Sequence, residues 1–134
     1  MTIRLLLAGV FILLSIAPGW ARDIVDMAGR SVTVPDRIER AVGCVAPVNW
    51  MIYAVAPMKL AAFTSRPDDG DWQILDPRLK SRPVIGSFLG GQGVNQEILL
   101  AVDPDVVIFW GEPTSPVAQR WLLKLEQWNI PVVF

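Results

Sequence analysis

The sequence predicts an α/β domain in which short parallel strands alternate with helices around one sheet. Residues 40–45, 60–63 and 106–109 are short and mainly hydrophobic, as expected for strands covered on both faces. Segments with capping residues and helical periodicity stand between such strands. This alternation is typical of a parallel sheet with right-handed crossovers, a three-layer, Rossmann-like arrangement.

The section before the first predicted sheet strand is of a different kind. Residues 22–35 alternate loosely between apolar and polar positions and predict a hairpin or extended arm that turns at Gly29. Residues 67–83 are rich in Asp and Pro and predict a loop with one helical turn at 72–75. In chain order, strands are expected at 40–45, 60–63, 84–86, 106–109 and 129–134, and helices at 48–55, 95–102 and after Ser115.

The segment from Gly93 to Trp110 gives the clearest local prediction. Asn95 is suited to cap a helix, and Glu97 in its first turn complements the helix dipole. Pro104 ends that helix, because it lacks an N–H and restricts the residue before it. The strand that follows delivers Trp110 to the carboxyl edge of the sheet, where ligands bind in open α/β folds.

A last helix is predicted from Ser115, which is suited to the N-cap, with Pro116 in the first turn. An apolar stripe of 3.6-residue period should face the core. It consists of Val117, Trp121, Leu125 and Trp128.

The N-terminal residues have the pattern of a secretory signal peptide. Arg4 precedes the apolar run Leu5–Leu14, which is short for a membrane span, and Pro18-Gly19 follows. Cleavage after Ala21 is expected, so residues 1–21 are assigned to the signal peptide and 22–134 to the mature domain. Cleavage after Ala17 and an uncleaved anchor are the alternatives.

Composition limits what the mature domain can do. The chain has 134 residues and a formal charge of −1, and loss of residues 1–21 leaves 113 residues with a charge of −2, enough for one domain and not basic enough for nucleic acid. There is no histidine, which excludes His-dependent catalytic triads and His-ligated metal sites. Cys44 is the only cysteine, so it forms no intramolecular disulfide, and on a buried strand it should be an inert core thiol.

Several motifs together resemble a known family, the periplasmic binding proteins of ABC importers for vitamin B12, ferric siderophores and haem. The resemblance covers most of the mature chain. It rests on Asp26–Pro35, Arg40–Tyr53, Gly93–Ile98 with Asp103–Ile108, and Trp128–Val133, in this order and behind a signal peptide.

The resemblance implies a non-enzymatic solute-binding protein without a cofactor, exported to the periplasm. Members have two α/β lobes joined by a long helix, so this chain would be the N-terminal lobe, lacking the helical linker and C-terminal lobe, and should bind ligand weakly alone. The expected partners are a metal-chelate ligand and the transporter permease, with membrane contact only through the permease. The alternative is an exported α/β enzyme or scaffold fragment that shares only the architecture.

The resemblance also assigns candidate site residues. A first-turn glutamate, here Glu97, would dock onto arginines of the permease; the alternative is a plain acid that supports its own helix. Ligand contacts are expected from loops after the strands, where Phe88 and Trp110 would stack on the ligand or pack on its rim. Arg66 would meet an anionic ligand or remain a solvated loop charge. The full ligand set is Ala46, Pro47, Asn49, Ser65, Arg66, Phe88 and Trp110, with neighbouring Thr64.

Two further motifs are set aside. The glycine-rich segment Ser87–Gly93 lacks the Gly-Lys-Ser/Thr ending of a phosphate-binding loop and the dinucleotide fingerprint. Residues 68–71, Asp-Asp-Gly-Asp, have no acidic residue at the position that would close a calcium loop. No resident metal site is therefore predicted.

Overall fold

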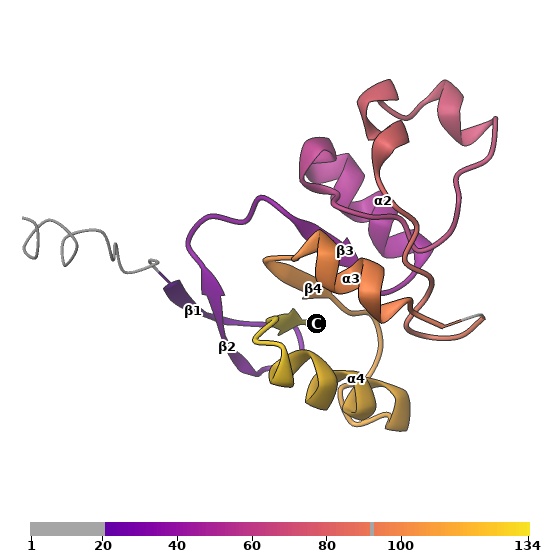
Figure 1. Cartoon of the computed structure of the whole chain (residues 1–134). Coiled ribbons are helices and arrows are strands. Elements are labelled where there is room, and N and C mark those ends of the chain that lie inside the picture. Colours follow the sequence, from indigo (N-terminus) through magenta and orange to yellow (C-terminus); the bar gives the residue numbers. More distant parts are fainter. Residues whose placement is uncertain (1–20, 92) are drawn as a thin grey trace, which may run out of the picture.

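The computed structural model describes residues 21–91 and 93–134, and it shows an α/β fold built on a parallel sheet (Figure 1). An antiparallel hairpin precedes the sheet. The strands are β1 (Ala21–Val25), β2 (Ser31–Pro35), β3 (Ala41–Gly43), β4 (Val106–Ile108) and β5 (Val132–Val133). The helices are α2 (Ala46–Val55), α3 (Gln96–Val102) and α4 (Pro116–Gln127), and short 3₁₀ turns occur at η1 (Pro57–Lys59), η2 (Asp71–Gln73) and η3 (Pro77–Ser81). The predicted fold class is confirmed.

The sheet winds outward from its centre in two directions. Strands β3, β4 and β5 are parallel neighbours in that order. On the far side of β3 the sheet continues through two isolated parallel bridges, from Ala41 to Leu60 and from Phe63 to Val84. The chain therefore moves from β3 outward on one side, then crosses back to β4 and continues to β5. This is the strand order of a doubly wound sheet, and its direction changes between β3 and β4.

Helices α3 and α4 begin where the sequence indicates. Asn95 Oδ1 accepts a hydrogen bond from the N–H of Ile98 at 3.1 Å, and Ser115 Oγ accepts one from Ala118 at 3.3 Å, so both predicted N-caps are confirmed. Helix α3 ends at Asp103, whose φ of 50° is left-handed. Helix α2 packs on β3, and Figure 1 shows α2 and α4 on opposite sides of the strands.

The core lies between these layers. Val42 and Val107, in neighbouring strands, are fully buried, as are Leu99 of α3 and Leu125 of α4. Of the stripe predicted on the last helix, Trp121 and Leu125 are buried, and Val117 and Trp128 are half-buried. Each fully buried leucine contributes about 1.5–3 kcal/mol relative to exposure, so this interior holds the three layers together.

The N-terminal hairpin turns at Gly29, as predicted, with a φ of 75°. Its turn is fixed to the end of β5 by Asp26. The buried carboxylate accepts hydrogen bonds from the N–H groups of Ala28, Arg30 and Phe134 at 2.9–3.2 Å, and from the Arg30 guanidinium at 2.8 Å. The Arg30 guanidinium also lies 4.6 Å from the centre of the Phe134 ring. Burial raises the pKa of Asp26, but the hydrogen bonds to Arg30 and Phe134 outweigh it and hold the pKa below its usual value.

Two details differ from the sequence-based expectation. The predicted strands at 60–63 and 84–86 are reduced to single bridges, because only Ala61, Phe63 and Ile85 donate ladder hydrogen bonds there. The 67–83 section contains η3 as well as a turn at η2, because Asp76 Oδ1 accepts a hydrogen bond from the N–H of Arg78 at 2.9 Å and caps the extra turn. The loop is therefore more regular than its Asp and Pro content predicts.

Candidate functional site

The change of winding direction places the ends of β3 and β4 side by side at the carboxyl edge of the sheet. The N–H of Cys44 donates to the carbonyl of Ile108 at 2.9 Å, and the N–H of Trp110 donates to Cys44 Sγ at 3.1 Å. Burial raises the pKa of the Cys44 thiol, so it stays protonated and acts as a core group, as predicted. The carboxyl edge at such a switch point is where open α/β sheets bind ligands.

Trp110 is one of the predicted site residues that a partner molecule can reach. Its side chain is 58% exposed, while its backbone is anchored to Cys44. Ala46 and Pro47, which follow the neighbouring strand, are half-buried and exposed respectively. The three residues thus share one edge, and an exposed indole there can stack on a flat ligand.

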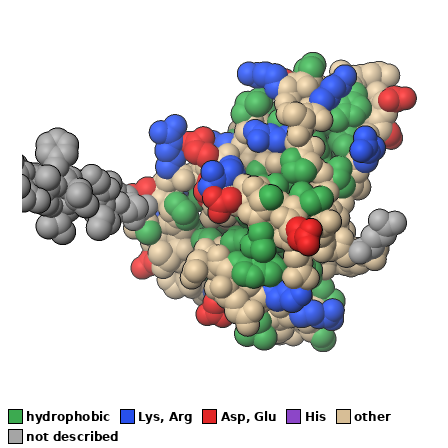
Figure 2. Space-filling view, viewed as in Figure 1, with side chains coloured by type: hydrophobic (Ala, Val, Ile, Leu, Met, Phe, Trp, Pro, Cys, Tyr) green, Lys and Arg blue, Asp and Glu red, His purple; other side chains and the backbone are tan. Residues whose placement is uncertain are grey.

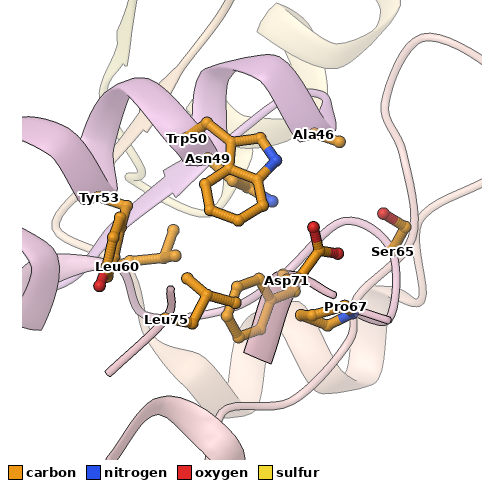
Figure 3. A pocket seen from close by; sticks show the side chains of 10 residues that line it. Ala46, Asn49, Trp50, Tyr53, Leu60, Ser65, Pro67, Asp71 and Leu75 are labelled. Atoms are coloured by element: carbon orange, nitrogen blue, oxygen red, sulfur yellow. The ribbon is translucent and has the colours of Figure 1, made fainter. Parts of the chain in front are cut away.

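Asn49 is also at this end of the molecule but faces inward. Its Nδ2 donates to Thr64 Oγ1 at 3.0 Å, and its Oδ1 is buried without a hydrogen-bond partner among the described residues. It lines a small cavity of about 20 Å³ beneath Trp50, with Ser65 and Asp71 at the opposite wall (Figure 3). That volume suits about one water molecule. Asn49 therefore supports the site from beneath.

Ser65 and Arg66 lie beside a larger hollow. Both side chains are exposed, and the hollow, about 740 Å³, is bounded on its other side by the glycine-rich loop and the start of α3. Thr64, directly before them, is buried and held by Asn49. The two exposed residues are thus presented from a fixed backbone at the end of a sheet segment.

Phe88 does not occupy the exposed position that was expected. Its side chain is only 3% exposed, and its ring packs edge to face on Phe109 and Trp121, with centres 5.6 and 4.8 Å away. The loop folds back because the N–H of Phe88 donates to the carbonyl of Cys44 at 3.0 Å. In this structure the Phe88 ring packs in the core and is not exposed for stacking, so its place in the ligand set stays a prediction.

Glu97 is exposed on the first turn of α3, as expected. It borders a second hollow of about 580 Å³, whose other charged residues are Arg40 and Arg82 and whose floor is apolar. Ile98, the next residue, lines both this hollow and the one beside Arg66. On the face of the molecule that carries α3, charges of both signs surround grouped hydrophobic side chains (Figure 2). Such a surface has the mixed character of a protein contact.

Sequence reasoning missed some residues of these hollows. Ser87 and Ile98 border the hollow beside Arg66, and Arg82 borders the one beside Glu97. Ser87 directly follows a predicted strand, so its position was a usable signal. Arg82 and Ile98 are half-buried and carry no local signal, because their places beside these hollows depend on contacts between distant residues.

The acidic residues at 68–71 form hydrogen bonds with one another. The N–H of Asp68 donates to Asp71 Oδ2 at 2.9 Å, and the N–H of Asp71 donates to Asp68 Oδ1 at 2.8 Å. Within residues 21–91 and 93–134, no group of three or more His, Cys, Asp or Glu side chains is placed to hold a metal ion. In the same residues, no helix has the length and hydrophobicity needed to cross a membrane.

No protein-family model matches the sequence, and comparison with curated proteins finds no match. Solved structures do match. An ABC transporter solute-binding protein from Sulfurospirillum deleyianum is 26% identical with a TM-score of 0.69, over 84% of this chain and 35% of that one. The molybdate periplasmic binding protein of an ABC transporter from Haemophilus influenzae is 30% identical, with a TM-score of 0.62, over 84% of this chain and 33% of that one. A periplasmic solute-binding protein from Veillonella parvula is 25% identical, with a TM-score of 0.64, over 85% and 35%.

These structures define the class: the chain has the fold of one lobe of a solute-binding protein. More particularly, it resembles the periplasmic binding proteins of ABC importers, and the resemblance inferred from its sequence is confirmed. The chain spans about a third of the length of the proteins it matches. Those proteins are transport-associated binding proteins and not enzymes, in agreement with the expectation that this chain is not an enzyme.

Proposed function

We propose that the chain is the solute-binding component of an ABC importer, which captures a metal-containing small molecule outside the inner membrane and delivers it to the permease. The observation that carries this proposal is the match at 26–30% identity to solute-binding proteins of ABC transporters, over 84% of the chain. The exposed carboxyl edge of the sheet, with Trp110 and Arg66, supplies the ligand-facing groups.

The ligand belongs to one of two chemical groups. The sequence resemblance favours a chelate such as cobalamin, a ferric siderophore or haem. The Haemophilus structure, described as bound to molybdate, adds a metal oxyanion. An exposed indole suits a flat chelate, whereas an exposed guanidinium suits an anion of either group. Both ligands would use the same edge of the sheet.

Export to the periplasm is part of the proposal. Residues 1–20 lie outside the described residues, so the signal peptide is supported by the sequence pattern alone. Strand β1 begins at Ala21, one residue before the expected boundary. Sequencing the N-terminus of the protein recovered from the periplasm would test cleavage after Ala21. Mature protein that begins at Arg22 is expected, and a start at Pro18 would favour the alternative site.

Delivery is assigned to Glu97. Its carboxylate is exposed on a helix whose Leu99 is buried in the core, so it can present two acceptor oxygens to an arginine of the permease. The apolar floor of the adjacent hollow would bury against the same partner. The carboxylate therefore marks the surface that meets the membrane protein.

Reversal of this charge tests the assignment. In the complete transport system, Glu97→Arg should abolish uptake while the affinity of the isolated binding protein for its ligand stays unchanged. The matched control is Glu126→Arg, because Glu126 is an exposed helical glutamate on α4, outside both hollows. Uptake by the Glu97→Arg protein at the unmodified rate would refute the docking role.

A further inference from the structure

The hollow beside Arg66 differs from the other hollows of the described surface in the groups that face it. It has a volume of about 740 Å³ and lies at the carboxyl ends of the two bridged sheet segments. Two short stretches, Thr64–Arg66 and Gly86–Ser87, form one part of its polar wall, and Asn95 at the start of α3 forms another. These stretches are neighbours because the sheet pairs Phe63 with Val84 directly before them. Two sequence-distant turns are thereby brought to one site.

Both stretches carry backbone donors that no acceptor among the described residues uses. Among the described residues, the N–H groups of Ser65, Arg66, Gly86 and Ser87 donate no hydrogen bond to protein acceptors. By contrast, the N–H of Ile85, one residue earlier, donates to the carbonyl of Phe63 at 2.8 Å. Successive unused N–H groups at the end of a strand form the kind of concavity that binds anions.

The charges around this hollow favour the same sign of ligand. Arg66 is exposed and forms no ion pair with the described residues, and none of the described residues that line the hollow is acidic. The hollow beside Arg40 and Arg82 contains Glu97, and the cavity beneath Trp50 contains Asp71. Of these three hollows, as lined by the described residues, the one beside Arg66 combines an exposed guanidinium with polar walls and no carboxylate.

The rim of the hollow is held in place before any ligand arrives. Gly86 has a φ of 89°, and a Cβ built there would lie 1.9 Å from the carbonyl oxygen of Gly93. The N–H of Asn95 donates to the carbonyl of Ile85 at 2.7 Å and closes the base of the same loop. Donors fixed in this way lose little conformational entropy on binding.

We infer that this hollow binds the oxyanion or carboxylate group of the transported solute. The Arg66 guanidinium would pair with the anionic oxygens, and the N–H groups of the two stretches and the Ser65 hydroxyl would donate to them. The inference rests on the proposed function and narrows it. It names an anionic, oxygen-rich ligand and excludes neutral or cationic chelates from this subsite.

Titration of the isotope-labelled chain with sodium molybdate, inorganic phosphate and ferric citrate tests this by NMR, with sodium chloride held constant. At least one of the three should shift the amide signals of Ser65, Arg66, Gly86 and Ser87 in a saturable manner. Arg66→Gln should weaken that binding at least tenfold. The matched control, Arg120→Gln, removes an exposed arginine of α4 outside the hollow and should leave it unchanged.

The three titrants separate the sources of the anionic group. A response to molybdate or phosphate alone assigns a free oxyanion, and a response only to ferric citrate assigns a carboxylate-bearing chelate. The absence of any shift at the four amides, or equal affinity of the wild type and Arg66→Gln, overturns the inference. If Arg66→Gln does not fold, Arg66→Lys keeps the charge without the planar fork and should bind with intermediate affinity.

Failure of this inference is distinguishable from failure of the proposed function. If the complete protein binds and imports a neutral chelate such as cobalamin, and Arg66→Gln has no effect on either step, the solute-binding role stands and the anionic subsite is rejected. If Arg66→Gln abolishes binding of the anionic titrants but no transport is found, the subsite stands without the transport role.

Discussion

The two ends of the parallel sheet differ in whether their polar and charged groups have partners within the protein. At the amino end, Arg40 precedes β3 and Asp105 precedes β4, and the two side chains are joined at 3.0 Å. Asp105 Oδ2 also accepts hydrogen bonds from the N–H groups of Glu39 and Arg40 at 2.7 and 2.8 Å. Every strong polar group in this cluster therefore has a partner within the chain.

At the carboxyl end several polar groups have no hydrogen-bond or ion-pair partner among the described residues. Arg66 and Trp110 are exposed after their sheet segments, and the N–H groups of Ser65 and Ser87 donate to no described residue. Unsatisfied donors are tolerated there because solvent or a ligand can reach them. The comparison indicates that the amino end stabilises the lobe and the carboxyl end is kept available for binding.

Asp26 is an exception to this comparison, because it is a stabilising group near the carboxyl end of the sheet. It holds the hairpin to Phe134, directly after β5. Its side chain is fully buried. Asp26→Asn should therefore have the largest effect, a loss of about 2–3 kcal/mol in the free energy of unfolding, since an amide cannot accept all of the charge-assisted hydrogen bonds. Urea denaturation monitored by circular dichroism would measure it.

The same residue sets a pH dependence. Because the folded-state pKa of Asp26 lies below its ordinary value, the stabilisation is present above about pH 4 and is lost as the pH falls through the folded pKa. Wild type should lose stability over that acidic range more steeply than Asp26→Asn. If the free energy of unfolding depends on pH equally in the two proteins, the proposed stabilising role of the Asp26 carboxylate is refuted.

At the amino end, a smaller loss of stability is expected, and its size should depend on how exposed the substituted carboxylate is. The Asp105 side chain is 17% exposed and supports two strand starts, whereas the Asp103 side chain is 80% exposed and pairs only with Arg40. Asp105→Asn should cost about 1–2 kcal/mol. Asp103→Asn, which also tolerates the left-handed backbone, should cost less than about 0.5 kcal/mol. Equal losses in urea denaturation would remove the distinction between half-buried and exposed pairing.

The smallest effect is expected at the carboxyl end. Trp110→Ser removes a mostly exposed ring and leaves the backbone bond to Cys44 intact, so the free energy of unfolding should change by less than about 0.5 kcal/mol. Ligand affinity should fall at the same time. A stability loss as large as that of Asp26→Asn would show that Trp110 is a core residue, contrary to the comparison.

Local sequence signals predicted the fold well where a few neighbouring residues decide the structure. Asn95 and Ser115 cap their helices because the acceptor and the N–H it satisfies are three residues apart. Gly29 turns the hairpin because glycine adopts its positive φ without strain. Trp110 and Glu97 are exposed as expected.

Contacts between distant residues could not be predicted in this way. Asp26 is 108 residues from Phe134, so its clamp has no local pattern. Phe88 was expected at the ligand edge because it lies in a glycine-rich loop, but that loop folds back and places its ring against Trp121. The unused N–H groups beside Arg66 depend on the bridge from Phe63 to Val84, which the sequence predicts only as two short strands.

The close contact at the base of the glycine-rich loop determines where this protein can vary. Gly86 cannot gain a side chain, because its Cβ would collide with the carbonyl of Gly93. Gly90 and Gly91 at the tip have open space around the position of a Cβ, and the φ of 73° at Gly91 is one that asparagine tolerates. Changes of ligand preference during evolution or design can therefore accumulate at the tip, while the base keeps the sheet and the anion-facing donors unchanged.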